Sequence, residues 1–192
     1  LKEISNDFET VLQKVPKGTG DAVKKASVLL EKFTGIILVC FGDTPFLTSK
    51  TLKKMIKSFN NETKLVITGF KKIEKNNYGK IIFSTKNEPV EIIEQKDAEE
   101  RNIHSEFCNG GAMAIHSSVL NQLNKIQENL NSGEFYLTDL VKILNHAKKK
   151  ITFIEINEEE ILGINNQVDL SVAEKISQIH LRRNAMLKGV KL

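Results

Sequence analysis

The sequence of 192 residues predicts an α/β fold built on a mostly parallel sheet in three layers. Three observations lead to this fold class. Apolar runs alternate with amphipathic segments along residues 1–70. The run at 35–41 is apolar without alternation, as in a parallel strand that is covered on both faces. The length suits one domain with a substantial core.

The first part of the chain alternates between strand and helix patterns. A Pro/Gly loop at 16–20 separates the first two elements, and Thr48 or Ser49 is a candidate N-cap. The predicted elements are, in order, a strand end at 11–13, a helix at 21–32, a strand at 35–40, a helix at 48–59 and a strand at 65–70. This order is typical of βαβ units.

The second part begins differently, with two short strands around a turn at Asn87-Glu88-Pro89. They predict an inserted antiparallel segment. The predicted elements are strands at 79–84, 90–94 and 108–115, helices at 117–130 and 137–149, a strand at 150–156 and a helix at 168–187. We find neither an internal repeat nor a low-complexity linker.

Composition argues against several classes of function. The chain has 28 basic and 24 acidic residues, no Trp and two Tyr, and its only arginines are Arg101, Arg182 and Arg183. A nucleic-acid surface usually combines clustered arginines with aromatic rings. No apolar stretch is long enough to span a membrane. Two cysteines, Cys40 and Cys108, make neither a disulfide framework nor a zinc site, so a reducing cytoplasm is the simplest compartment.

A candidate metal ligand follows the most apolar strand, in the segment Phe41-Gly42-Asp43-Thr44-Pro45. Ligands of open α/β sheets bind beyond the carboxyl ends of the strands. A carboxylate there suits Mg²⁺, which takes few protein oxygens. A plain turn, with Asp43 as a helix cap, explains the same segment equally well.

The segment Gly18-Thr19-Gly20 precedes a helix, where backbone N–H groups suit a phosphate or a base edge. It matches neither a Walker loop nor a dinucleotide fingerprint. Considered alone, it is more simply a loop that enters a helix.

Four further segments carry polar residues beside predicted strands. Each also has a structural explanation, as a hairpin entry, a solvated charge run, a strand opening and a turn. They are Tyr78-Gly79-Lys80-Ile81, Glu94-Gln95-Lys96-Asp97-Ala98, Asn109-Gly110-Gly111 and Asn165-Asn166. The four histidines are scattered, and we interpret them as surface or packing residues.

Taken in order, these motifs resemble one family: the uridylyltransferase (pyrophosphorylase) half of the bifunctional bacterial enzymes that make UDP-N-acetylglucosamine. The resemblance covers nearly the whole chain. The matching segments are Gln13 with 17–22, then 41–45, 78–81, 93–98, 109–111, 133–139, 163–166 and the tail 183–190.

The resemblance implies a Rossmann-like nucleotidyltransferase fold, a mixed sheet with an antiparallel sugar-binding insertion. It implies the substrates UTP and N-acetylglucosamine 1-phosphate, Mg²⁺ as cofactor, and a product used for peptidoglycan and lipopolysaccharide. The family's roles carry over residue by residue. Gln13, Gly18 and Thr19 resemble the uracil loop; Phe41, Gly42 and Asp43 the nucleotide segment; Gly79, Glu94 and Asn109 the sugar site; and Asp43 with Asn165 the Mg²⁺ ligands.

This sequence departs from the family pattern at three positions. Phe41 stands where Tyr is usual, Gly110 where Thr is usual, and Asp21 where His is usual. Two rival functions stay open. One is a sugar-1-phosphate nucleotidyltransferase for another base or sugar, and the other is a non-catalytic UDP-sugar-binding remnant.

The family's opening strand, with its Gly-rich loop, and its acetyltransferase β-helix have no counterpart in the 192 residues. We therefore expect a piece of a longer protein, inactive by itself. Residues 1–166 are then a partial pyrophosphorylase domain, and 167–192 a linker helix. We expect a cytoplasmic full-length form that is a homotrimer through its C-terminal domain and has neither nucleic-acid nor membrane partners.

Overall fold

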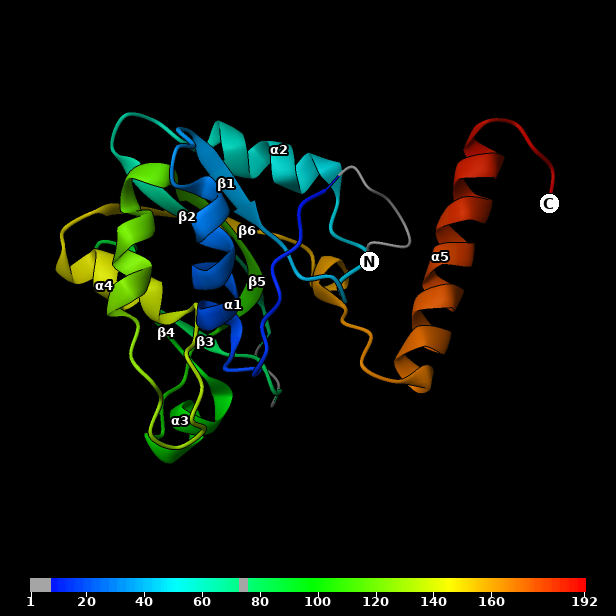
Figure 1. The fold of residues 1–192 in the computed structure, drawn as a ribbon. Helices are drawn as coiled ribbons and strands as arrows, with labels where there is room; N and C mark the ends of the chain where they lie inside the picture. The colour runs from blue at the N-terminus through cyan, green and yellow to red at the C-terminus, as the bar shows by residue number, and fades with distance from the viewer. Residues whose placement is uncertain (1–7, 73–75) are drawn as a thin grey trace.

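The computed structural model of the chain describes residues 8–72 and 76–192. A mixed sheet of six strands lies at its centre, in the order β4-β3-β5-β2-β6, with β1 paired to β5 (Figure 1). The strands are β1 (Ile36–Val39), β2 (Thr63–Lys71), β3 (Lys80–Phe83), β4 (Pro89–Ile93), β5 (Phe107–His116) and β6 (Lys150–Glu155). The mixed sheet is confirmed.

The expected parallel character of the sheet is wrong for the strands described. Only β2 and β6 pair in parallel, whereas β5 runs antiparallel to β1, β2 and β3. The strands β1 and β2 are parallel to each other, but β5 lies between them. The unbroken apolar pattern of β1 is therefore typical of a parallel strand, although β1 forms its hydrogen bonds with an antiparallel neighbour. Its residues are half-buried rather than fully covered.

Helices cover both faces of the sheet, which confirms the three layers. The strand β2 is buried on both sides: Val66 faces the cluster under α2 with Met55, and Leu65 faces the cluster with Leu140 of α4. The helical elements are α1 (Thr19–Ala26), η1 (Ser27–Leu30), α2 (Ser49–Lys57), α3 (Gln95–Glu100), η2 (Ser117–Lys125), α4 (Asp139–His146), η3 (Glu158–Ile161) and α5 (Gln167–Leu187).

Several expected elements differ from those observed. Residues 11–13 form no strand, and the helix expected at 117–130 is the 3₁₀ helix η2. The charged segment after Glu94 is the short helix α3. Thr48 is the N-cap of α2, since its side chain accepts the backbone N–H of Thr51 at 3.1 Å. The β3–β4 pair is the expected antiparallel hairpin.

The helix α5 stands beside the sheet domain rather than within it (Figure 1). Asn166 caps its start by accepting the N–H groups of Val168 and Asp169. It contacts the domain through His180, which lies 3.0 Å from the Glu159 carboxylate of η3. Among the described residues, no helix has the length and apolar character needed to cross a membrane.

Candidate functional site

A cavity of about 580 Å³ opens between α1, β5 and the segments that precede β3, α3 and α4. Its walls come from segments far apart in the sequence. Predicted site residues that line it are Gln13, Gly18, Thr19, Phe41, Gly79, Glu94 and Asn109. The structure thus brings together seven of the ten predicted site residues, although their roles stay predictions.

The loop before α1 is held against the segment before α4. Gly20 N–H donates to the Phe135 carbonyl at 2.8 Å, and Thr19 Oγ1 accepts the Leu137 N–H at 3.1 Å. Gly18 has a φ of +90°, and a side chain there would come within 2.6 Å of the Phe135 oxygen. A glycine is required at this position because both the backbone angle and the close approach exclude a Cβ.

Gln13 is oriented by its neighbours at the mouth of this loop. Its Nε2 donates to Asp21 Oδ2 at 2.6 Å and lies 3.4 Å from the Gly18 carbonyl. The hydrogen bond from Gln13 is the main reason why the pKa of Asp21 is lowered, and Lys25 adds to it. The amide nitrogen of Gln13 is therefore engaged, which directs its oxygen toward other donors.

Phe41 lines the cavity and is packed against Gly111. Gly111 has a φ of +78°, and a Cβ there would lie 2.6 Å from Cε2 of Phe41. Its N–H is accepted by Asn109 Oδ1 at 3.1 Å. Gly111 therefore lets the ring approach the backbone, and its N–H holds the Asn109 side chain along the strand.

Gly79, Glu94 and Asn109 meet in one part of the cavity. Asn109 N–H donates to the Gly79 carbonyl at 2.8 Å. A Cβ on Gly79 would lie 3.5 Å from Glu94 Oε2 and 3.2 Å from the Ile93 oxygen. These three residues form one polar surface that can accept hydroxyl and amide donors.

Glu94 is a half-buried carboxylate in an acidic neighbourhood. Burial is the main cause that raises its pKa, and Asp139, Asp97 and Glu134 raise it further. The Thr138 hydroxyl opposes these effects by donating to Glu94 Oε1 at 2.8 Å. Because Thr138 binds one carboxylate oxygen, the other oxygen is turned toward Gly79.

Asp43 and Asn165 both lie close to Gly163, and none of these three residues lines the cavity. A Cβ on Gly163 would lie 3.7 Å from Asp43 Oδ2 and 3.8 Å from Asn165 Nδ2. The Ile164 N–H donates to the Asp43 carbonyl at 2.9 Å and ties the two loops together. No heavy atom lies within 4 Å of a Cβ built on Gly42, so the backbone before Asp43 is open.

This donor set fits Mg²⁺. The Asp43 carboxylate and the Asn165 amide both lie near Gly163, and Mg²⁺ keeps several water or phosphate ligands beside one or two protein oxygens. In the part of the chain that the structure describes, no cluster of three or more His, Cys, Asp or Glu could hold a metal.

Several cavity residues were given no role from the sequence, among them Tyr78, Tyr136 and Thr138. Each lies in a segment that carries the family resemblance, at 78–81 or 133–139. Position within these segments was the only available signal. Thr138 is identified by its hydrogen bond to Glu94, which joins residues 44 positions apart.

Comparison with known proteins agrees with this arrangement. The family profile described as "Nucleotidyl transferase" matches residues 1–159. The chain belongs to the nucleotidyl transferase family. It is 38% identical to the bifunctional protein GlmU of Ruegeria sp. (strain TM1040), over 99% of this chain and 42% of that protein. It is 37% identical to GlmU of Paramagnetospirillum magneticum, over 96% of this chain and 42% of that protein.

The resemblance stated from the motifs is thereby confirmed, and the chain spans about two fifths of the length of these relatives. Solved structures agree on the nucleotidyl transferase fold. A UDP-glucose pyrophosphorylase complexed with UDP-glucose superposes with a TM-score of 0.65 at 17% identity, covering 88% of this chain and 66% of that one. A nucleoside-diphosphate-sugar pyrophosphorylase from Vibrio cholerae RC9 gives 0.61 at 15% identity, covering 83% and 66%.

Proposed function

We propose that this nucleotidyl transferase carries the uridylyl-transfer site that joins UTP and N-acetylglucosamine 1-phosphate, giving UDP-N-acetylglucosamine and pyrophosphate. The observation that carries the proposal is the shared cavity. The Gly18-Thr19 loop, the Asp43 segment and the polar surface of Gly79, Glu94 and Asn109 border one space. A base, a diphosphate and a sugar lie in this order in the product.

The reaction needs no nucleophilic side chain. A phosphate oxygen of the sugar phosphate attacks the α-phosphorus of UTP, a new P–O bond forms, and the bond to the β-phosphate breaks as pyrophosphate leaves with the electron pair. Catalysis then rests on orientation and on neutralisation of charge. Mg²⁺, held by Asp43 and Asn165, would supply charge neutralisation at the phosphates.

The chain's own residues supply the orientation. Gln13, with its nitrogen on Asp21, presents its amide oxygen to the N3–H of uracil. Glu94 accepts sugar hydroxyl or acetamido donors. Asn109, whose oxygen already accepts the Gly111 N–H, offers its amide N–H groups, and Phe41 packs along the nucleotide side. Burial of Glu94 strengthens its hydrogen bonds because water competes less.

Titration with UDP-N-acetylglucosamine, UDP and UDP-glucose tests the proposal. We expect UDP-N-acetylglucosamine to bind most tightly, and Glu94→Ala to lower its affinity about tenfold or more while UDP is little affected, since a hydrogen bond to a charged group is worth about 1.5–3 kcal/mol. Glu91→Ala is the matched control, because Glu91 lies on β4, which Glu94 directly follows, but pairs with Lys142. Equal losses for both ligands would indicate a structural role for Glu94.

The same titration, together with an assay of pyrophosphate release, separates the two rival functions. A clear preference for UDP-glucose favours a transferase for another sugar. Tight product binding favours a UDP-sugar-binding protein if a longer form that includes the family's opening strand and Gly-rich loop also releases no pyrophosphate from UTP and N-acetylglucosamine 1-phosphate. The pathway, the cytoplasmic location and the trimeric state of the full-length protein stay proposals that follow from this function.

A further inference from the structure

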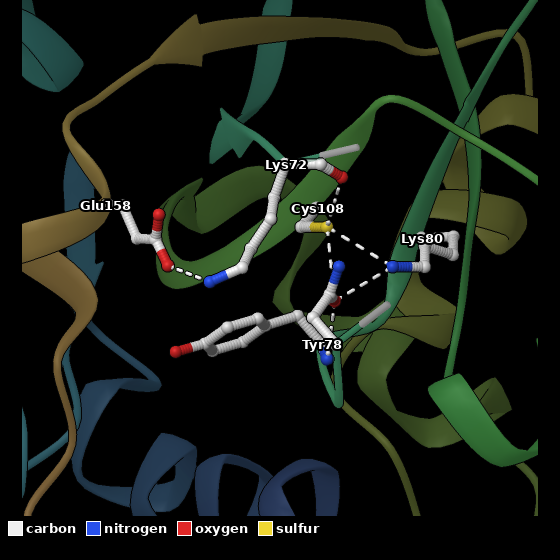
Figure 2. A network of polar contacts seen from close by, with 6 residues as sticks. Lys72, Tyr78, Lys80, Cys108 and Glu158 are labelled. Atoms are coloured by element: carbon white, nitrogen blue, oxygen red, sulfur yellow. Dashed lines mark hydrogen bonds and ion pairs between the residues drawn. The ribbon is translucent and has the colours of Figure 1, made fainter. Parts of the chain in front are cut away.

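Lys80 is a buried lysine at the start of β3, with 9% of its surface exposed. Its Nζ donates to Asn76 Oδ1 at 2.8 Å and to Cys108 Sγ at 3.3 Å, and Figure 2 shows it pointing at the Cys108 sulfur. Outside 1–7 and 73–75, no carboxylate forms an ion pair with it. A buried ammonium with only neutral acceptors is unusual, because buried charges are normally paired.

The position of Lys80 relates it directly to the sugar residues. Lys80 is opposite Cys108 in the antiparallel β3–β5 pairing. Opposed residues share a face of the sheet, and the next residue along each strand points to the other face. Those next residues are Gly79 and Asn109, which line the cavity, whereas Lys80 and Cys108 do not.

The contacts of Lys80 close the turn that presents Gly79. Asn76 Oδ1 accepts the Lys80 ammonium and also the Tyr78 N–H at 3.0 Å. The segment from Asn76 to Lys80 is thereby folded back on itself and held to β5 through Cys108. On the far side of Lys80, a second link joins the strands, from Ser105 Oγ to the Ile81 carbonyl at 2.7 Å.

We propose that Lys80 is a positioning residue for the sugar subsite. Its hydrogen bonds to Asn76 and Cys108 set the separation of Gly79 and Asn109, the pair that would receive the N-acetyl sugar. This inference rests on the proposed function. The hydrogen bonds of Lys80 go to Asn76 and Cys108, whereas the Gly18-Thr19 loop is held by Phe135 and Leu137. Its role is therefore confined to the sugar side of the cavity.

Two measurements on three variants test this role. Lys80→Met replaces the lysine by an unbranched apolar side chain without the donors. Cys108→Ala removes one acceptor, and Ser105→Ala is the matched control, because Ser105 links to the next residue of β3. Hydrogen exchange measures the protection of the Asn109 backbone amide, which donates to the Gly79 carbonyl. Calorimetric titration compares UDP-N-acetylglucosamine with UDP.

We expect Lys80→Met to speed exchange of the Asn109 amide and to weaken UDP-N-acetylglucosamine about tenfold, with UDP unchanged. Cys108→Ala is expected to change the same two quantities in the same direction by a smaller amount. It tests the inference by itself if Lys80→Met does not fold. Ser105→Ala lowers the melting temperature but leaves both readouts at the wild-type level.

Two results would overturn the inference: unchanged Asn109 exchange in the variants of Lys80 and Cys108, or equal losses of affinity for UDP-N-acetylglucosamine and UDP. Failure of the proposed function is distinguishable. In that case the wild-type protein does not bind UDP-N-acetylglucosamine, and exchange of the Asn109 amide decides by itself whether Lys80 holds the two strands.

Discussion

Replacing Glu94 by glutamine is expected to stabilise the folded protein at pH 7 while it weakens ligand binding. In the described structure the Glu94 carboxylate receives one hydrogen bond, from Thr138 at 2.8 Å. Burial and nearby carboxylates raise its pKa, so its charged form is disfavoured in the fold. A glutamine keeps the shape and an oxygen acceptor for Thr138 but carries no charge.

The sign of the pH dependence follows from the direction of the shift. The ordinary pKa of Glu94 is 4.5, and the folded value is higher. The folded state therefore holds this proton more tightly, and stability is lost as the pH rises from the unfolded pKa through the folded one. A gain of about 1 kcal/mol at pH 7, an ordinary size for one substitution, raises the melting temperature of a domain this large by about 2–4 °C.

Thermal unfolding at pH 7 and pH 4 measures this effect, with Thr138→Val as the opposite perturbation. Glu94→Gln is expected to melt higher than wild type at pH 7 and equally at pH 4, where the glutamate is mostly neutral. Thr138→Val melts lower at pH 7, because the half-buried Glu94 carboxylate then loses a hydrogen bond worth about 1.5–3 kcal/mol. A Glu94→Gln protein that melts lower at pH 7, or keeps its gain at pH 4, would refute the reasoning.

Three further substitutions test other parts of the site. In a longer form of the protein that shows the activity, Asp43→Ala is expected to lower Mg²⁺-dependent turnover about a hundredfold, measured as initial rates at several Mg²⁺ concentrations. Wild-type rates at ordinary Mg²⁺ concentrations would show that Asp43 is not part of the site. Gly111→Ala is expected to lose about 1–3 kcal/mol of stability in denaturant unfolding, because φ is +78° and Phe41 is 2.6 Å from the new Cβ; an unchanged midpoint contradicts this packing. Gln13→Leu is expected to weaken UDP binding about tenfold and to raise the pKa of Asp21 toward its ordinary value in an NMR titration; an unmoved Asp21 titration would show that Gln13 does not hold it.

The sequence alone was sufficient for the alternation of helices and strands, because each element carries its own periodicity. The apolar pattern of β2 and the Thr48 cap of α2 are local properties. The motifs also predicted which residues border the cavity, since seven of them line it. Local pattern was insufficient for β1, whose residues are typical of a parallel strand while its partner β5 runs antiparallel.

Only the tertiary structure decided how the site residues are held. Thr138 binds Glu94 from 44 positions away, and Thr19 accepts the Leu137 N–H across 118 positions. The position of Lys80, next to Gly79, is fixed by a single pair in the strand register, Lys80 with Cys108. Burial, charge neighbours and hydrogen-bond partners depend on which distant segments pack together, and no local window of sequence contains both partners of such a contact.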